Sequence, residues 1–177
     1  MGTVFSAYKK SLSLDNLIDS EFYELIEDLI ATEEVKSLAD YVQHYDINRL
    51  QHVMSVAYLS FLVCKKLRLD TSAAARAGLL HDLFYYDWHE KDDGSHRLHG
   101  YRHPAFAAEN AKKLTTISKK EENIILRHMW PLTLTPPKYR ESFVVTMSDK
   151  YCASVEIVYS ISEKYNLKFM DLGLKMV

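Results

Sequence analysis

The sequence predicts an all-α fold, on three observations. Apolar residues recur at the three-to-four-residue spacing of helices along most of the chain, and no segment alternates with the period of two that a half-buried strand shows. Only five glycines and four prolines occur in 177 residues, too few for the frequent turns of an all-β fold. The apolar and charged fractions, 47% and 26%, are those of an ordinary globular protein.

The helical pattern divides the chain into a short N-terminal part and a larger core. We expect residues 1–46 to form a helical appendage and residues 47–177 to form one domain, a bundle of roughly seven or more helices. A Ser-x-x-Glu capping box at Ser118 predicts one helix start, and Asp70 or Thr71 is expected to cap another. The helices are expected over residues 21–30, 32–42, 47–68, 72–86, 104–114, 119–129 and 141–165, with a polar loop over residues 87–102.

Composition also limits the partners and the compartment. The formal net charge is −2 and the lysines and arginines are scattered, so a nucleic-acid polymer is not expected as a partner. The longest mainly apolar run, residues 56–64, is about half of what crosses a bilayer, and the N-terminus lacks a hydrophobic signal core; we therefore expect no membrane association and a cytoplasmic location. Cys64 and Cys152 lie among apolar neighbours and are expected to be free, buried thiols.

Histidines and aspartates recur inside or beside apolar segments, where polar side chains need a reason. An ionised aspartate on a core-facing stripe costs several kcal/mol unless it is paired or bound to a metal. A single histidine of this kind is more often a satisfied core residue than a ligand, but that explanation weakens as the set grows. One divalent ion would neutralise two such aspartates and bind the imidazoles around them. The candidate ligands are His52, His81, Asp82, His103, His128 and Asp149.

Their order along the chain, H…HD…H…H…D, resembles the signature of the HD superfamily of metal-dependent phosphohydrolases, over about residues 47–160. The two additional histidines are similar to those of HD-type diadenosine tetraphosphate hydrolases and HD-GYP-like phosphodiesterases. The resemblance implies a helical bundle with a central metal site. It also implies one ion on His52, His81, Asp82 and Asp149, and a second on Asp82, His103 and His128. Asp82 would bridge the two ions and is the residue expected to be essential for turnover.

The chain departs from the HD-GYP pattern at three places. The doublet continues as HDLFYYD rather than HDIGK, and residues 100–103 read GYRH rather than a Gly-Tyr-Pro motif, so cleavage of a cyclic dinucleotide is not implied. His128 also lacks the adjacent second histidine of that group. The resemblance therefore implies hydrolysis of a phosphate ester or anhydride of a nucleotide or small metabolite, with the particular substrate left open.

Such a reaction needs cations near the metal site to bind the phosphate. Arg49 lies one helical turn before His52 and Lys150 follows Asp149 directly. Arg97, His99 and Arg102 belong to the predicted loop ahead of His103, where His99 is expected to bind phosphate or donate a proton. Each of them could instead be a solvated surface group. Aromatic residues near this loop could stack on a nucleobase or pack in the core; they are Tyr85, Tyr86, Trp88 and Trp130.

Two other classes of function fit the same residues. Some HD-fold proteins that hold a di-iron pair on this ligand pattern are oxygenases, and a non-catalytic module could use the residues to bind a nucleotide or a structural metal. The ligands do not select the metal, because iron, manganese, cobalt, nickel and zinc all bind such sites. A phosphorylated small molecule is the expected substrate, and a homo-oligomer is compatible with the sequence.

Overall fold

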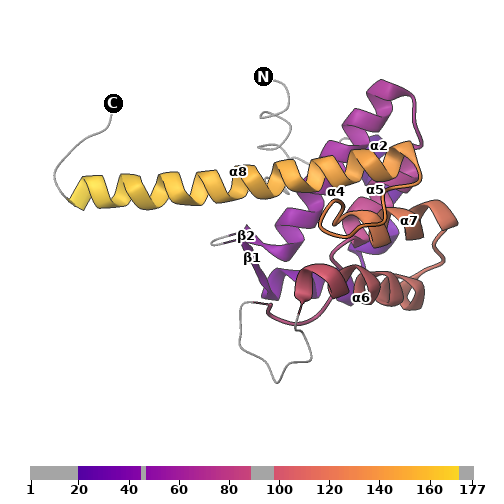
Figure 1. Cartoon of the computed structure of the whole chain (residues 1–177), viewed down its shortest axis with the longest axis horizontal. Coiled ribbons are helices and arrows are strands. Elements are labelled where there is room, and N and C mark those ends of the chain that lie inside the picture. The colour runs from indigo at the N-terminus through magenta and orange to yellow at the C-terminus, as the bar shows by residue number, and fades with distance from the viewer. Residues whose placement is uncertain (1–19, 45–46, 89–97, 172–177) are drawn as a thin grey trace.

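A computed structural model describes residues 20–44, 47–88 and 98–171, and confirms the all-α prediction. Within these ranges it contains seven α-helices, one 3-10 helix and a single antiparallel pair of very short strands, β1 and β2 (Figure 1). No helix in the described ranges is both long enough and apolar enough to cross a bilayer. The elements are α2 Ser20–Ile30, α3 Glu33–Lys36, η2 Ser37–Asp40, β1 Val42–His44, β2 Ile47–Asn48, α4 Arg49–Leu67, α5 Thr71–Leu80, α6 His99–Leu114, α7 Lys119–Arg127 and α8 Arg140–Asp171.

Four helix starts in the described residues are fixed by side-chain caps, and Thr32 caps α3 by accepting from the N–H of Val35. Ser118 accepts from the backbone N–H of Glu121 while the Glu121 carboxylate accepts from the N–H of Ser118, which confirms the predicted capping box. Asp70 caps α5 by accepting from Ala73. The same reciprocal arrangement, formed by Asn48 and Gln51, starts α4 and was not predicted.

The strand pair corrects two predicted boundaries. Residues 32–42 do not form one helix: α3 ends at Lys36, η2 follows, and the chain turns extended at Tyr41 so that Val42 pairs with Asn48. The helix predicted from residue 47 accordingly begins at Arg49, after the strand. These short strands lie beside the N-terminal end of α4 and bring the end of the predicted appendage against the core (Figure 1).

Four other helices differ from their predicted lengths: α7 ends at Arg127 rather than 129, α8 runs to Asp171 rather than 165, and α5 and α6 differ beside the candidate site. The predicted helix 72–86 stops at Leu80, because the N–H of Leu83 bonds back to Leu80 and that of Phe84 to Asp82. In contrast, α6 starts at His99, inside the predicted loop. A Cβ at residue 100 would lie 2.8 Å from Leu132 Cδ2, so Gly100 allows this close approach rather than breaking the helix.

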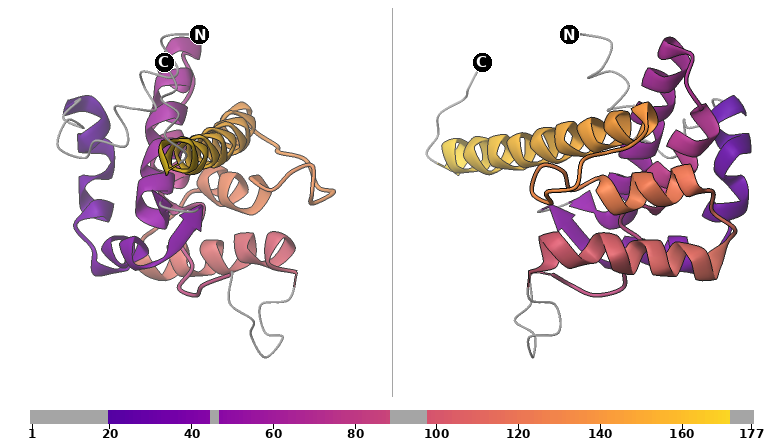
Figure 2. Two further views of the ribbon diagram at one scale, coloured as in Figure 1. Left: turned by 90° about the vertical axis from the view of Figure 1, so that its left-hand side faces the viewer. Right: turned by 45° about the vertical axis from the view of Figure 1, so that its right-hand side comes forward.

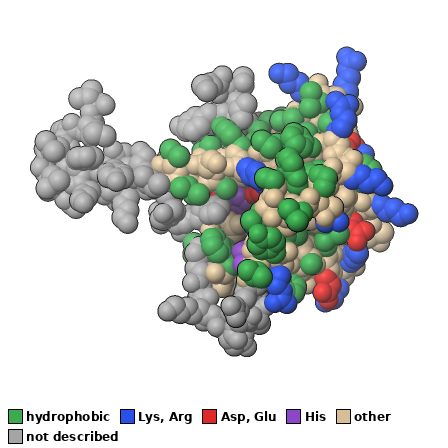
Figure 3. All heavy atoms as spheres, viewed as in Figure 1, with side chains coloured by type: hydrophobic (Ala, Val, Ile, Leu, Met, Phe, Trp, Pro, Cys, Tyr) green, Lys and Arg blue, Asp and Glu red, His purple; other side chains and the backbone are tan. Residues whose placement is uncertain are grey.

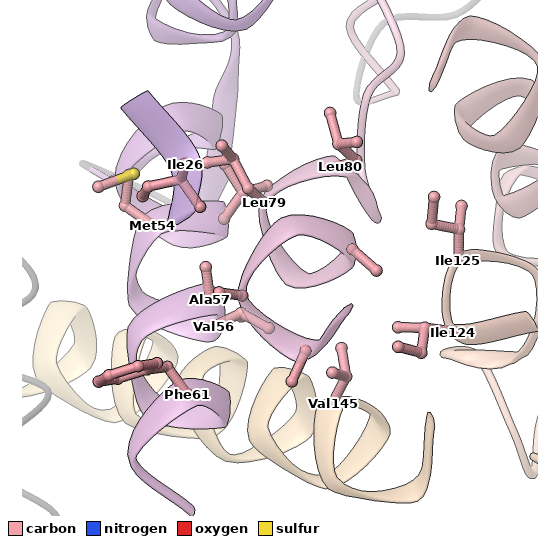
Figure 4. Packing of buried hydrophobic residues seen from close by; sticks show 14 of the residues in the cluster. Ile26, Met54, Val56, Ala57, Phe61, Leu79, Leu80, Ile124, Ile125 and Val145 are labelled. Carbon is pink, nitrogen blue, oxygen red and sulfur yellow. The ribbon is translucent and has the colours of Figure 1, made fainter. Parts of the chain in front are cut away.

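The core is built around α4 and α5, which pack closely along their length (Figure 4). Gly78 is the closest point: a Cβ there would lie 2.9 Å from Ala57 Cα. Helices α2, α7 and α8 cover this pair, and α8 continues well beyond the body of the protein (Figures 1 and 2). Cys64 and Cys152 are free and buried, as predicted.

Candidate metal centre

The six candidate ligands, which come from five helices, lie together in the interior. His52 is on α4, His103 on α6 and Asp149 on α8, while the His81-Asp82 doublet follows the end of α5 and His128 follows the end of α7. Because α5 ends at Leu80, both members of the doublet lie at a turn. All six are buried except Asp149, whose side chain is 14% exposed.

One half of the centre consists of His52, His81 and Asp149. The Nε2 atom of His52 lies 3.2 Å from Asp149 Oδ1, and the Nε2 atom of His81 lies 3.6 Å from the same oxygen. His52 and Asp149 are 97 positions apart in the sequence, so only the folded bundle brings them together. One donor atom from each residue lies within 4.8 Å of the others, the separation expected of groups that could share one ion.

The other half consists of His103 and His128. Asp82 lies between the two halves. Asp82 Oδ1 faces the histidine pair, at 3.2 Å from His103 Nε2 and 3.6 Å from His128 Nε2. Asp82 Oδ2 lies on the side of His81, 3.7 Å from its Nε2. The two carboxylate oxygens of Asp82 thus face different imidazoles: Oδ1 faces His103 and His128, and Oδ2 faces His81.

Backbone carbonyls orient three of the four imidazoles. The Nδ1 atoms of His81, His103 and His128 lie 2.7–2.9 Å from the carbonyl oxygens of Gly78, His99 and Ile125, respectively. A carbonyl oxygen can only accept, so each Nδ1 carries a proton and each Nε2 faces the centre, where in the neutral form of the ring it holds the lone pair that binds metal. The helical backbone has therefore selected the tautomer that binds metal.

Some polar atoms of the centre are poorly satisfied by the protein alone, and a cation would satisfy them. The Nε2 of His103 and that of His128 are 2.7 Å apart, and two lone pairs at this distance repel unless a proton or a metal ion lies with them. Burial and the neighbouring imidazoles lower the pKa of His128 to about 3, which opposes the proton. Within the described part, His81 Nε2 and Asp82 Oδ1 are buried without a hydrogen-bond partner. A divalent ion would satisfy these atoms together.

The carboxylates would be available as anions. Burial by itself would raise the pKa of Asp82, but the imidazoles around it, His81 first, hold that pKa well below its usual range. The pKa of Asp149 is lowered in the same way, because His52 and His81 outweigh burial. Both side chains can therefore contribute negative charge at neutral pH.

A carboxylate that sequence reasoning missed orients the fourth imidazole. Glu156 on α8 is fully buried, and its oxygens lie 3.0 and 3.1 Å from Nδ1 of His52. Burial disfavours a charged His52, but Glu156 and Asp149 prevail and raise its pKa well above the ordinary value. Glu156 follows Asp149 by seven residues, two turns of the same helix face, and this spacing was the available signal.

Arg49 is not placed to bind phosphate, contrary to prediction. Its side chain is fully buried, with Nε donating to Gln43 Oε1 at 2.9 Å and the terminal nitrogens donating to the carbonyls of Phe84 and Tyr86. Gln43 in turn donates to Asp82 Oδ2 at 2.8 Å. Arg49 therefore fixes the orientation of the Gln43 amide, and Gln43 holds the Asp82 carboxylate. Gln43 belongs to the predicted appendage and was missed.

The other residues predicted to bind substrate differ in whether they line the cavity beside the centre. Lys150 and His99 line a cavity of about 640 Å³ that opens onto Asp82, His128 and Asp149. Arg102 is exposed and does not line this cavity; its guanidinium lies 5.4 Å from the ring centre of Phe106. It was predicted to face phosphate from a loop, but the helical start of α6 directs it elsewhere. Arg97 lies outside the described residues.

Together, this helical bundle and its buried histidine–aspartate centre define a metal-binding type of domain. A model of the HD domain family matches residues 49–154, well over half of the chain. The chain therefore belongs to the HD domain family, whose members are mostly metal-dependent hydrolases. No curated protein and no solved structure matched it significantly.

Proposed function

We propose that the chain is a metal-dependent phosphohydrolase that acts on a phosphate ester or anhydride of a small metabolite or nucleotide. The observation that carries the proposal is the convergence of six donor side chains, five of them buried, with Asp82 Oδ1 facing His103 and His128 and Asp82 Oδ2 facing His81. Family membership supports the reaction class, and the cavity beside the centre provides room for a substrate.

The donor set fits one or two divalent ions of iron, manganese, cobalt, nickel or zinc. His52, His81, Asp82 and Asp149 would hold one ion, and Asp82, His103 and His128 the other. Ions bound there would supply Lewis-acid chemistry, lowering the pKa of water and balancing phosphate charge. In the overall reaction the water oxygen bonds to phosphorus, the bond from phosphorus to the leaving oxygen breaks, and that oxygen takes up a proton.

Side chains at the edge of the cavity would manage substrate and proton. Lys150 donates to the carbonyl of His128 at 2.9 Å, which holds its ammonium beside the centre, where it would attract a phosphate oxygen. His99 is held by the Tyr86 hydroxyl, 2.9 Å from its Nδ1, and would give a proton to the leaving oxygen. Gln43 and Glu156 would act only by holding Asp82 and His52.

The test is release of inorganic phosphate from a panel of phosphorylated metabolites by the purified chain, with and without a chelator. Phosphate release that the chelator stops, and that a divalent ion restores, is the expected result. Asp82→Asn should abolish it, whereas Asp40→Asn, the same change at an exposed position, should not. Metal-loaded protein that releases no phosphate would contradict the proposal; oxygen uptake by that protein would indicate an oxygenase, and no turnover a binding module.

A further inference from the structure

The cavity beside the candidate metal centre has two unlike ends. At its inner end are carboxylates and imidazoles of the centre, together with Lys150. Its remaining described walls are mainly rings and aliphatic groups from residues that carry no charge. Histidine side chains are visible in a recess bordered by hydrophobic side chains (Figure 3). A ligand that fills the cavity would therefore place a charged group at the inner end and an apolar group outside it.

One wall is a stack of three rings that leads towards the centre. The ring of Trp88 lies parallel to that of His99, with an interplanar angle of 7° and 5.4 Å between ring centres. His99 stacks in turn on His103, at 18° and 4.4 Å. The helical start of α6 produces this stack, because residues 99 and 103 are one turn apart on the same face. The Tyr86 hydroxyl holds His99 in place.

Another part of the lining is aliphatic and packs against the same helix start. It comes from the segment after α7 and from α8, and includes Met129, Pro131, Leu132 and Ala153. Gly100 lets this wall approach closely, since a Cβ there would meet Leu132 at 2.8 Å and Met129 at 3.6 Å. A lining of aromatic and aliphatic side chains suits a flat or apolar group, which it removes from water.

Apart from the proposed metal ions, the described lining of the cavity carries one cationic side chain, which suits one phosphate group rather than a chain of phosphates. Lys150 is the single lysine or arginine among the described lining residues. Arg49 is buried in bonds to Gln43 and two carbonyls, and Arg102 lies over Phe106. Each further phosphate would bring negative charge against apolar walls, where an unpaired charge is costly.

We propose that this cavity selects phosphate monoesters that carry a flat or apolar organic group, held against Trp88, in preference to polyphosphates. The selectivity rests on the proposed phosphohydrolase function and states which substrates that function serves. In the reaction, water and the monoester give inorganic phosphate and the free hydroxy compound, with no other reactant.

The binding half of the proposal is tested without turnover, with phenylphosphonate and methylphosphonate as probes. Titration calorimetry on the metal-loaded chain should give phenylphosphonate an affinity at least about tenfold higher, the usual effect of one aromatic stack. Trp88→Ala should remove this difference, Trp88→Phe should restore most of it, and Tyr101→Ala, an exposed aromatic on α6, should leave it unchanged. Equal affinities, or no binding of either probe, would overturn the proposal.

The kinetic half compares 1-naphthyl phosphate, glycerol 3-phosphate and inorganic tripolyphosphate. We expect kcat/KM to fall in that order, and Trp88→Ala to raise KM for the naphthyl ester about tenfold with little change for the glycerol ester. Better hydrolysis of tripolyphosphate than of the naphthyl ester would overturn the selectivity. If phenylphosphonate binds as expected but no ester is hydrolysed, the phosphohydrolase function fails while the assignment of the cavity stands.

Discussion

Arg49 gives the sharpest contrast between what the sequence predicts and what the structure predicts. If Arg49 bound phosphate, as its position before His52 predicts, Arg49→Met would raise KM and leave the free energy of unfolding unchanged. In the structure Arg49 is fully buried and makes three hydrogen bonds to carbonyl oxygens, with its guanidinium carbon 3.7 Å from the ring centre of Phe84. Arg49→Met should therefore act on stability first.

The size of the effect follows from two opposing contributions. Hydrogen bonds from a charged donor contribute about 1.5–3 kcal/mol each, so three lost bonds cost about 4.5–9 kcal/mol. Burial lowers the pKa of Arg49 to about 10, which corresponds to a cost of roughly 3 kcal/mol for the charged guanidinium. The methionine variant carries no charge and therefore recovers this free energy. Methionine keeps the apolar contact with Phe84. The lost bonds prevail, and the expected loss of unfolding free energy is about 1.5–6 kcal/mol.

The assay is urea unfolding of the metal-free protein, which separates stability from metal binding and turnover. Arg102→Met is the matched control: it is the same substitution at an exposed arginine that the sequence also assigned to phosphate, and it should stay within about 0.5 kcal/mol of the parent. If Arg49→Met unfolds at the parental urea concentration and only KM rises, the structural role assigned to Arg49 is wrong.

Two further substitutions test the centre and the core. Glu156→Gln removes the carboxylate behind His52 and should weaken metal binding about 10–100-fold, measured by competition with a metal-binding dye. Gly78→Ala should destabilise the protein by about 1–3 kcal/mol in urea unfolding, because the new Cβ meets Ala57 Cα at 2.9 Å and this clash exceeds the gain of roughly 1 kcal/mol in helix propensity.

Each of these has a control on the same chain. Glu33→Gln changes an exposed glutamate, 87% accessible, and should leave metal affinity unchanged; an equal loss in both variants would contradict the role of Glu156. Gly100→Ala meets the end of the Leu132 side chain, which is 44% exposed and can move, so it should cost less than Gly78→Ala. A Gly78→Ala variant as stable as the parent would show that α4 and α5 do not pack as described.

The sequence predicts the helices and the six candidate ligands because both leave periodic or spaced signals in the chain. It fails where distant segments decide the conformation. Gly100 suggests a helix break, yet it lies in the first turn of α6, where it leaves room for Leu132, and this turn brings His99 over His103. Arg49 is on the expected helix face, but nothing local reveals that Gln43 and two carbonyls surround it.

Supporting residues are harder to predict than ligands for the same reason. Gln43 lies outside the segment that matches the HD domain family and reaches Asp82 only because β1 pairs with β2. Glu156 could have been found from its seven-residue spacing after Asp149, since that spacing places both on one face of α8. The tautomers of three histidines depend on backbone carbonyls at or near helix ends, which no side-chain pattern encodes.

Metal stoichiometry tests the central claim most directly. After the chain is loaded separately with manganese, iron, cobalt, nickel and zinc and then desalted, elemental analysis should find up to two ions per chain. His103→Ala should retain one ion, and Asp82→Asn should lose at least the second. Protein that retains none of these metals would contradict the account, as would an Asp82→Asn variant that retains the full parental content.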